Sequence, residues 1–379
     1  MSEKSEVALI PCSTYEKDAV YQALGEGIRL LGGMEKFAVP GEKIVVKPNF
    51  LKKAEPEKAV MTHPSVIEGF CRLLFEKGHE RIVVGDSCGH GTTTKVLSGL
   101  KLEESLQKYG AEVRDFTDGG NFAWECGKQA KSFRLAKEIQ EADAVISLAK
   151  MKTHALERIT GAVKNSYGFI YGMYKAKGHT VYPNADSFAR MLVDLNQCVA
   201  PRLYVLDGIV AMEGNGPGSG DPIAMNVLLL SKDPVALDSV FCHLVHLRPE
   251  LVPTNDHGER MGLGTWKREQ IRVLTLGGEI SMSEAVKKYG NPGFQVDRRP
   301  VKKGIWTNLA GVLQTFQKKP RIVPDKCVKC GICVQSCPVE GKAISFKKGK
   351  NEPPVYDYSK CIRCFCCQEM CPRKAIIVK

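Results

Sequence analysis

The chain has 379 residues, which is enough for two or three domains of ordinary size. Hydrophobic residues make up 43% and charged residues 25%, which excludes a disordered or fibrous chain. No apolar run approaches the roughly 20 residues that cross a bilayer, and the first residues lack the pattern of a secretory signal. We therefore expect a cytoplasmic protein without a membrane partner.

The formal net charge of +12 is concentrated at the C-terminal end of the chain. Residues 319–379 contain 13 Lys or Arg and five Asp or Glu, so this segment carries +8 and the rest only +4. The segment has no basic arm and no basic stripe interleaved with aromatic residues, so we expect no nucleic-acid partner. Nine of the 15 cysteines also lie in this segment, which marks it as a separate domain.

The preceding part of the chain alternates strand-like and helix-like segments. The expected strands, in chain order, are residues 7–10, 43–47, 81–84, 112–116, 144–148, 203–206 and 225–230. The clearest helical patterns are at residues 18–31, 64–76 and 234–247. This alternation predicts an α/β domain with a mostly parallel sheet over residues 1–295. A linker over 296–318 and a small α+β ferredoxin-like domain over 319–379 complete the expected architecture.

Polar runs follow five of the expected strands. They are Lys47-Pro48-Asn49, Gly85 to Gly91, Lys150 to His154, Asp207-Gly208 and Ser231 to Asp233. Ligands of such sheets bind beyond the carboxyl ends of the strands, so we expect the five runs to form one cleft.

The side chains of these runs predict a site for an anionic small-molecule substrate. The cationic candidates are Lys47, Lys150, Lys152 and Lys164, which would bind a carboxylate or a phosphate unless they are solvent-facing lysines. The polar candidates are Asn49, Asn165, Asp86 and Ser87, which would bind the ligand or, alternatively, cap helices and form a tight turn.

Three residues are candidates for catalysis. Repulsion from nearby lysines favours the neutral form of His154, which suits a general base or a ligand. Glu213 starts the glycine-rich segment 212–221, which would close over the cleft and deliver an acid or base, or else only connect two strands. Lys164 is the third candidate.

The C-terminal segment repeats the spacing Cys-x2-Cys-x2-Cys-x3-Cys-Pro twice. This spacing is typical of cubane 4Fe-4S clusters, and the fourth cysteine of each group binds the other cluster. It predicts two clusters, the first bound by Cys327, Cys330, Cys333 and Cys371, and the second by Cys361, Cys364, Cys367 and Cys337. Zinc also binds Cys-x2-Cys pairs, but two full repeats that each end in Cys-Pro disfavour zinc. Cys366 is left over, at a position expected to point outward.

The segment resembles bacterial two-cluster ferredoxins over its whole length. Part of its positive charge would compensate the anionic clusters. The remainder favours an acidic electron carrier, such as a ferredoxin or flavodoxin, as a partner.

The motifs of the large region resemble one family. They are Lys47-Pro48-Asn49, Thr62-His63-Pro64, Gly85-Asp86-Ser87, Lys150 to His154, Gly161 to Asn165 and Asp233 to Asp238. They are similar to the DUF362 family, whose members often carry a C-terminal two-cluster ferredoxin domain. The resemblance covers nearly the whole chain but implies no specific reaction.

A weaker similarity links His154, Gly161 and Lys164 to nickel-pincer lactate racemases, where a comparable His and Lys hold an organometallic cofactor. The second glycine of that pattern and the Pro-Gly after its lysine are absent here.

The leading hypothesis is an iron–sulfur oxidoreductase in which the clusters exchange electrons with a substrate, or with an unidentified further cofactor, in the cleft. One alternative is an electron-transfer or assembly protein without catalysis of its own. The other is a racemase-like or isomerase-like enzyme with structural clusters.

Overall fold

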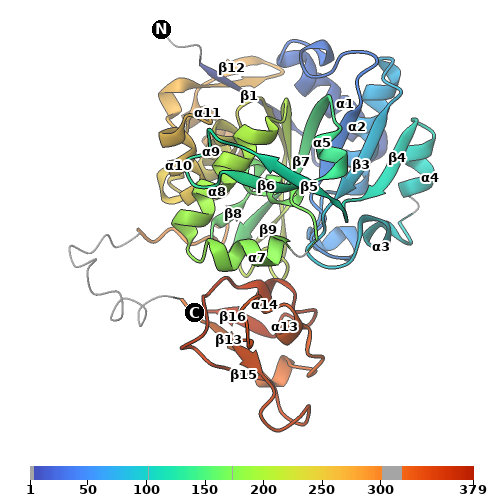
Figure 1. Ribbon diagram of the computed structural model, residues 1–379. Helices are drawn as coiled ribbons and strands as arrows, with labels where there is room; N and C mark the ends of the chain where they lie inside the picture. Colours follow the sequence, from blue (N-terminus) through green and yellow to red (C-terminus); the bar gives the residue numbers. More distant parts are fainter. Residues whose placement is uncertain (1–3, 101, 173, 301–317) are drawn as a thin grey trace.

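The computed structural model describes residues 4–100, 102–172, 174–300 and 318–379. A large domain is built on one central sheet with helices on both faces, as predicted. The small C-terminal domain, red in Figure 1, lies against the end of the large domain where β9 and α7 are labelled. Most of the predicted linker, residues 301–317, lies outside the described residues.

The central sheet has ten strands in the order β12-β11-β1-β10-β9-β7-β2-β3-β4, and β8 pairs with β7. Their bounds are β1 (Ser5–Pro11), β2 (Ile44–Pro48), β3 (Ile82–Asp86), β4 (Ala111–Asp115), β7 (Ala144–His154), β8 (Arg158–Thr160), β9 (Leu203–Glu213), β10 (Asp221–Ser231), β11 (Ile271–Thr275) and β12 (Gly278–Ile280). A separate hairpin consists of β5 (Gly119–Ala123) and β6 (Ser132–Ala136).

The direction of each strand decides at which end of the sheet its polar run lies. β9, β7, β2, β3 and β4 are parallel to their neighbours in this series. β10 is antiparallel to both β1 and β9. The carboxyl end of β10 therefore lies at one end of the sheet, and the carboxyl ends of β2, β3, β7 and β9 lie at the other end.

Helices cover both faces of the sheet (Figure 1). Those of the large domain are α1 (Lys17–Leu30), α2 (Pro64–Glu76), α3 (Thr93–Leu97), α4 (Leu102–Gln107), α5 (Lys137–Gln140), α6 (Ala162–Asn165), α7 (Tyr174–Val181), α8 (Ala185–Val199), α9 (Pro234–Leu244), α10 (Pro253–Met261) and α11 (Met282–Tyr289). Among the residues that the structure describes, no helix has both the length and the apolar character needed to cross a membrane.

Alternation along the central strands creates two cores. Leu228 and Leu230 of β10 pack on one face with α1 and α2. Val227 and Leu229 point to the other face and pack with α9. A period of two is what a strand covered on both faces requires, so these apolar runs fold as buried strands.

The small domain consists of short elements around its cysteines. They are β13 (Pro320–Ile322), α13 (Ile332–Gln335), β14 (Ile344–Ser345), β15 (Val355–Tyr356), α14 (Cys366–Glu369) and β16 (Ile376–Val378). Four cysteines belong to its core cluster, together with Ala343, Ile344, Ala375 and Ile376.

Candidate functional site

Three of the five predicted polar runs contribute to a cavity of about 650 Å³ between the two domains. These runs follow or end β2, β3 and β7, whose carboxyl ends point the same way. The prediction that Ser231 to Asp233 belongs to the cleft is wrong, because the run follows the antiparallel strand β10. Oδ1 of Asp233 instead accepts hydrogen bonds from the backbone N–H groups of Val235 and Ala236 and so caps α9.

Eight of the nine predicted catalytic and substrate-binding residues line this cavity. They are Lys47, Asn49, Asp86, Ser87, Lys152, His154, Lys164 and Asn165. The small domain lines it too, with residues that include Cys337, Cys366, Glu369 and Met370. The cavity is therefore shared by the two domains.

Lys47 and Asp86 form a buried ion pair in the cavity wall. Nζ of Lys47 lies 3.1 Å from Oδ1 of Asp86 and donates a hydrogen bond of 2.8 Å to Oδ1 of Asn165. Burial lowers the pKa of Lys47 to about 8, while the charge of Asp86 opposes this shift. A Cβ at Gly168 would lie 2.0 Å from Oδ1 of Asp86, so only glycine leaves room for the pair. Asp86 and Asn165 already bind the ammonium group of Lys47, so we assign this lysine a structural role in the cavity wall.

Lys152 and Lys150 are buried on β7 and are bound by other protein atoms. Nζ of Lys152 donates to Oδ1 of Asn49 at 2.6 Å and to the carbonyl of Val60 at 2.8 Å. Burial lowers the pKa of Lys152 well below its usual value, and the charge of Lys150 adds to this shift. Lys150 lies outside the residues that line the cavity, and its Nζ pairs with Oδ2 of Asp207 at 2.7 Å. This ion pair joins β7 to β9 beneath the cavity.

Lys164 differs from these lysines because its ammonium group has no direct polar partner among the described residues. Within the described part of the chain, its ammonium group forms no ion pair and no hydrogen bond. Nζ lies 5.2 Å from the ring centroid of Tyr167 and 5.3 Å from that of Phe188. The aromatic rings position the lysine without neutralising it, so Lys164 presents a positive charge to the cavity.

Two further cavity groups, Oγ1 of Thr160 and Nδ1 of His179, are buried without a hydrogen-bond partner among the residues described. The ring of His179 stacks on Phe188 with 4.6 Å between centroids. Burial lowers the pKa of His179 to about 3, so its imidazole is neutral. Buried polar groups normally have partners in folded proteins. Together with Lys164, these two atoms are polar groups of the cavity wall that no described residue contacts by a hydrogen bond.

His154 links the large domain to the small one. Its Nδ1 accepts hydrogen bonds of 3.1 Å from the N–H groups of Leu156 and Glu157, so its proton is on Nε2. Nε2 lies 3.1 Å from Oε1 of Glu369. Burial, with the charge of Lys164, lowers the pKa of His154. Burial opposes ionisation of Glu369, but contact with His154 and the charge of Lys164 outweigh it and lower the pKa of its carboxyl group.

The small domain docks mainly through α14 and the loop 214–220. Nε2 of Gln368, which is 0% exposed, donates to the carbonyls of Asn215 and Gly216 at 2.7 and 3.2 Å. Nζ of Lys52 donates to the carbonyl of Glu369 at 2.9 Å. The glycine-rich loop, which was expected either to close over the cleft or only to connect two strands, is held between the two domains. A Cβ at Gly216 would lie 2.3 Å from the carbonyl oxygen of Thr153, and one at Gly218 would lie 2.4 Å from that of Glu369, so both positions require glycine.

Glu213 is the predicted catalytic residue that the structure places apart from the others. It ends β9, and its Oε2 accepts a hydrogen bond of 2.7 Å from the N–H group of Gln295. It is not among the residues that line the cavity. Pro217 of the glycine-rich loop does line the cavity, but the carboxylate of Glu213 is engaged by Gln295 instead.

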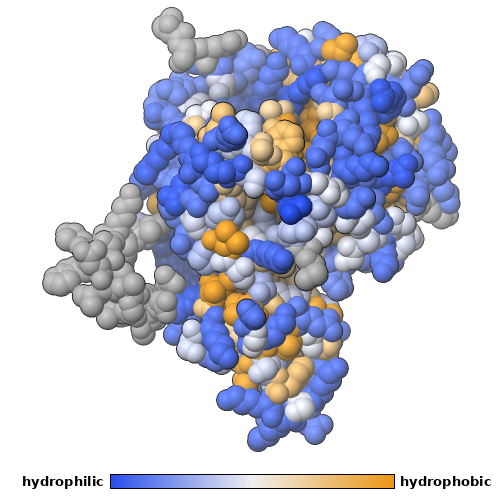
Figure 2. Space-filling view, in the orientation of Figure 1, coloured by the Kyte–Doolittle hydropathy of each residue, from blue (hydrophilic) through white to orange (hydrophobic). Residues whose placement is uncertain are grey.

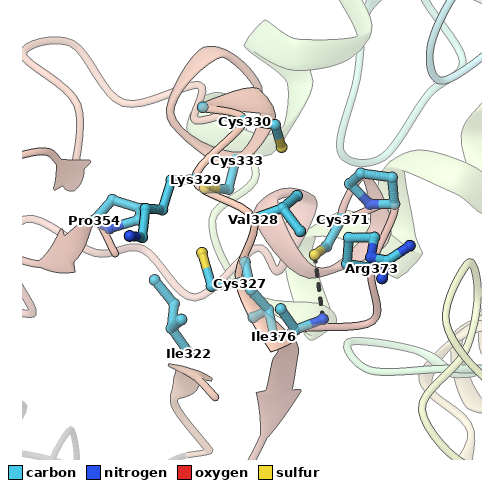
Figure 3. A pocket seen from close by; sticks show the side chains of 13 residues that line it. Ile322, Cys327, Val328, Lys329, Cys330, Cys333, Pro354, Cys371, Arg373 and Ile376 are labelled. Atoms are coloured by element: carbon cyan, nitrogen blue, oxygen red, sulfur yellow. Dashed lines mark hydrogen bonds between the residues drawn. The ribbon is translucent and has the colours of Figure 1, made fainter. Parts of the chain in front are cut away.

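The first predicted set of cysteines surrounds one pocket of the small domain. Figure 3 shows Cys327, Cys330, Cys333 and Cys371 around this pocket. The Sγ atom of Cys371 accepts a hydrogen bond of 3.3 Å from the N–H group of Ala375. Four cysteines in an apolar pocket, with a backbone N–H group directed at a sulfur, fit a cubane iron–sulfur cluster.

The second set, Cys361, Cys364, Cys367 and Cys337, has the same local backbone. Lys329 and Arg363, which precede the second cysteine of each group, both have a positive φ of 57°. Sγ of Cys337 accepts from the N–H group of Ala343 at 3.3 Å, as Cys371 does from Ala375. Sγ of Cys367 also accepts from the hydroxyl of Tyr356 at 3.2 Å. This donor set fits the same kind of cluster.

Cys366 lies between ligand positions, and its side chain lines the cavity. Cys366 was expected to point outward from the small domain, and it does so on the side that faces the large domain. It is the first residue of α14, the helix that also contributes Glu369 to the cavity.

The polar cavity residues that were not predicted include Thr160, Lys175, His179 and Glu369. Lys175 and His179 are four residues apart on α7, so they share one face of a helix that has little apolar character. The four-residue spacing of Lys175 and His179 could have indicated from sequence that both side chains face one site. Glu369 lies between two cysteines, and only the docking of the two domains gives it a place in the cavity.

Residues 44–243, more than half of the chain, match the model of DUF362, a domain of unknown function. The chain belongs to the DUF362 family. Residues 319–372 of this DUF362 protein match a 4Fe-4S dicluster domain, so it is an iron–sulfur protein, as the cysteine spacing predicts. The resemblance to a DUF362 protein with a cluster-binding C-terminal domain is confirmed.

The DUF362 protein is also similar to individual known proteins. A thylakoid-associated protein of Synechocystis sp. is 36% identical over 258 residues, which are 68% of this chain and 79% of the relative. A lactate racemase apoprotein from Thermoanaerobacterium thermosaccharolyticum has 13% identity and a TM-score of 0.44, covering 65% of this chain and 57% of that one. A protein from Thermotoga maritima has 10% identity and a TM-score of 0.35, with coverages of 67% and 61%. The family assignment rests on the sequence matches.

Proposed function

We propose that this DUF362 protein is a cytoplasmic iron–sulfur oxidoreductase that acts on an anionic small molecule bound between its two domains. The observation that carries the proposal is the cavity itself. Side chains of the cluster-binding domain line it together with buried polar groups that have no partner among the described residues. Its volume of about 650 Å³ lies within the range of small-molecule sites, and it would also accommodate a further cofactor.

The two sets of four cysteines would each hold one 4Fe-4S cluster. Clusters bound there supply one-electron transfer. Cys337 belongs to the second set and lines the cavity, so a molecule in the cavity lies next to this set. Binding and orientation of the substrate would depend on the side chains of the cavity wall.

These side chains would bind and orient the substrate. Lys164 attracts its anionic group, and Thr160 and His179 offer hydrogen bonds. The ionised carboxylate of Glu369 lies on the small-domain side of the cavity and repels that group. A substrate with one anionic end would therefore place it at Lys164 and direct its other end toward α14. His154 keeps its proton on Nε2 and holds Glu369 in place.

The test uses anaerobically purified, iron-loaded protein that has been reduced with dithionite and freed of excess reductant. Lactate, pyruvate, succinate, phosphoenolpyruvate and inorganic phosphate are then added separately. We expect at least one of these anions to bind, as seen by native mass spectrometry, and one to reoxidise the protein, as seen by loss of the electron paramagnetic resonance signal. Lys164→Met should weaken that binding about tenfold, since loss of one charge-assisted contact costs about 1.4 kcal/mol or more.

Lys58→Met is the matched control, because Lys58 is exposed and lies outside the cavity lining. Equal affinity in wild type and the Lys164 variant would remove Lys164 from the site. Protein with full iron content that binds no anion, and that contains no co-purified small molecule, would favour an electron-transfer protein without catalysis.

A further inference from the structure

The two cysteine sets have different surroundings, which gives the small domain two distinct ends. Among the described residues, only those of the small domain line the pocket of the first set (Figure 3). Cys330 of this set is exposed. Cys337 of the second set lines the cavity that the large domain covers. Electron transfer slows steeply with distance, so an external protein reaches the first set far more readily than the second.

The surface around Cys330 has an apolar centre and a basic rim. Val328 is 56% exposed. Lys326 and Arg373 are exposed, and neither forms an ion pair with another described residue; Asp325 is the exposed acidic neighbour. Figure 2 shows that the small domain presents apolar surface directly beside hydrophilic surface. An apolar centre within a charged rim is the usual construction of a protein–protein interface.

We propose that this surface, formed by Lys326, Val328, Lys329, Cys330 and Arg373, is the docking site of an acidic one-electron carrier protein that reduces the small domain. The proposal rests on the proposed function, because it supplies the electrons that the cavity would use. It follows from the charge of the domain, which is +8 over residues 319–379, and from the exposure of Cys330 in the first set, whereas the most accessible cysteine of the second set, Cys361, is half-buried. In each encounter the carrier loses one electron and the small domain gains one, and no covalent bond changes.

The first experiment measures reduction of the iron-loaded full chain by an acidic [2Fe-2S] ferredoxin in a stopped-flow instrument. Opposite charges accelerate association, and salt screens this effect. We expect the second-order rate constant to fall as salt rises from about 20 to 300 mM. The double variant Lys326→Glu and Arg373→Glu should be about tenfold slower at low salt and lose most of its salt dependence.

Two controls accompany this measurement. Lys287→Glu changes the net charge in the same sense at an exposed site on α11, far from the small domain (Figure 1), and should leave the rate within twofold. Dithionite should reduce all variants at one rate, because a small reductant needs no docking surface. A double variant that ferredoxin reduces at the wild-type rate, or a Lys287 variant slowed as much, would overturn the proposal.

A second experiment uses the wild-type chain and so does not depend on variant folding. A carbodiimide joins carboxylates of the ferredoxin to lysines in contact with them, and mass spectrometry locates the bonds. We expect cross-links at Lys326 or Lys329, and cross-links confined to the large domain would overturn the proposal. Lys164→Met should be reduced by ferredoxin normally, so failure of docking and failure of the cavity to bind an anion give different results.

Discussion

At the residue scale, the buried side chains near the cavity differ in how their charges are compensated. Lys150 pairs with Asp207, and Lys47 pairs with Asp86, at 2.7 and 3.1 Å. Loss of one partner from such a pair leaves a buried charge without compensation, which is strongly destabilising. Lys164 has no ion-pair partner among the described residues, so a neutral residue in its place breaks no direct ion pair and removes only its contribution to the lowered pKa of Glu369, which makes Lys164 a suitable probe of ligand binding.

His63 provides a pH-dependent test at the same scale. Its Nδ1 accepts a hydrogen bond of 3.2 Å from the N–H group of Ser65 at the start of α2, and its ring stacks on Tyr15 with 3.6 Å between centroids. Burial lowers the pKa of His63 to about 4, although the charge of Asp207 opposes the shift. Between pH 6.5 and 4 the unfolded chain binds a proton that the folded chain does not, so stability falls as pH falls through this window.

We therefore expect the free energy of unfolding to lose about 2 kcal/mol from His63 between pH 7.5 and 5. His63→Asn keeps a side chain that can cap α2 but cannot titrate. Urea unfolding of both proteins at both pH values measures the difference, and the variant should lose about 2 kcal/mol less than wild type. An identical loss in both proteins would show that His63 is protonated in the folded state.

At the element scale, α14 both completes the cavity and anchors the small domain. Gln368 makes its hydrogen bonds with the loop 214–220, which lies between β9 and β10. Gln368→Ala would leave buried carbonyls without donors, and we expect a cost of about 2 kcal/mol in docking free energy. Hydrogen exchange of residues 214–220 should become faster, while exchange in α9 should not change.

Gln335→Ala is the matched control, because Gln335 is an exposed glutamine of the same small domain. It should leave exchange in the loop unchanged. Unchanged exchange in the Gln368 variant as well would show that other contacts, such as that between Lys52 and Glu369, are sufficient for docking.

The elements also show where reasoning from sequence ends. Apolar alternation located the strands, but β7 and β9 continue past Leu148 and Leu206, where the expected strands ended. Polar residues follow at both points, Lys150 in β7 and Asp207-Gly208 in β9, and the pattern reads them as the start of a loop. The apolar residues beyond them lie in the cores of the large domain, whereas His154 at the end of β7 contacts Glu369 of the small domain. Hydrophobic pattern cannot reveal a surface that only docking of a second domain creates.

At the scale of the whole molecule, the two domains have independent cores of different kinds. The cores of the large domain are apolar and extensive. Half of the buried core cluster of the small domain consists of cysteines: Cys333, Cys337, Cys367 and Cys371. Such a core depends on bound metal for its stability.

Removal of iron should therefore unfold one domain and leave the other folded. We expect chelator-treated protein to keep the thermal transition of the large domain and to lose a separate transition of the small domain. Differential scanning calorimetry and circular dichroism of iron-loaded and iron-free samples measure this. Loss of both transitions on iron removal would contradict independent cores.

The domain plan and the cysteine spacing could be read from the sequence because each depends on local pattern. The cavity could be read only in part. His154 follows an expected strand and Lys164 lies in the Gly161 to Asn165 motif, so both were candidates, whereas Glu369 comes from a segment more than 200 residues away. Glu213 is not among the residues that line the cavity, and a glycine-rich composition alone cannot distinguish a lid from a connection that packs between two domains.

The hairpin of β9 and β10 has one more consequence. The last residue of β2 is level with Leu148 and, through it, with Val205 of β9, yet β9 continues to Glu213. At about 3.3 Å per residue, this overhang is roughly 25 Å long and reaches the small domain. The hairpin thus acts as a spacer whose length sets the width of the gap between the domains. Removing two residues from each of β9 and β10 would keep the same side chains on each face of the hairpin and would narrow the gap between the domains. Relatives with a shorter or longer hairpin should therefore accommodate molecules of different size.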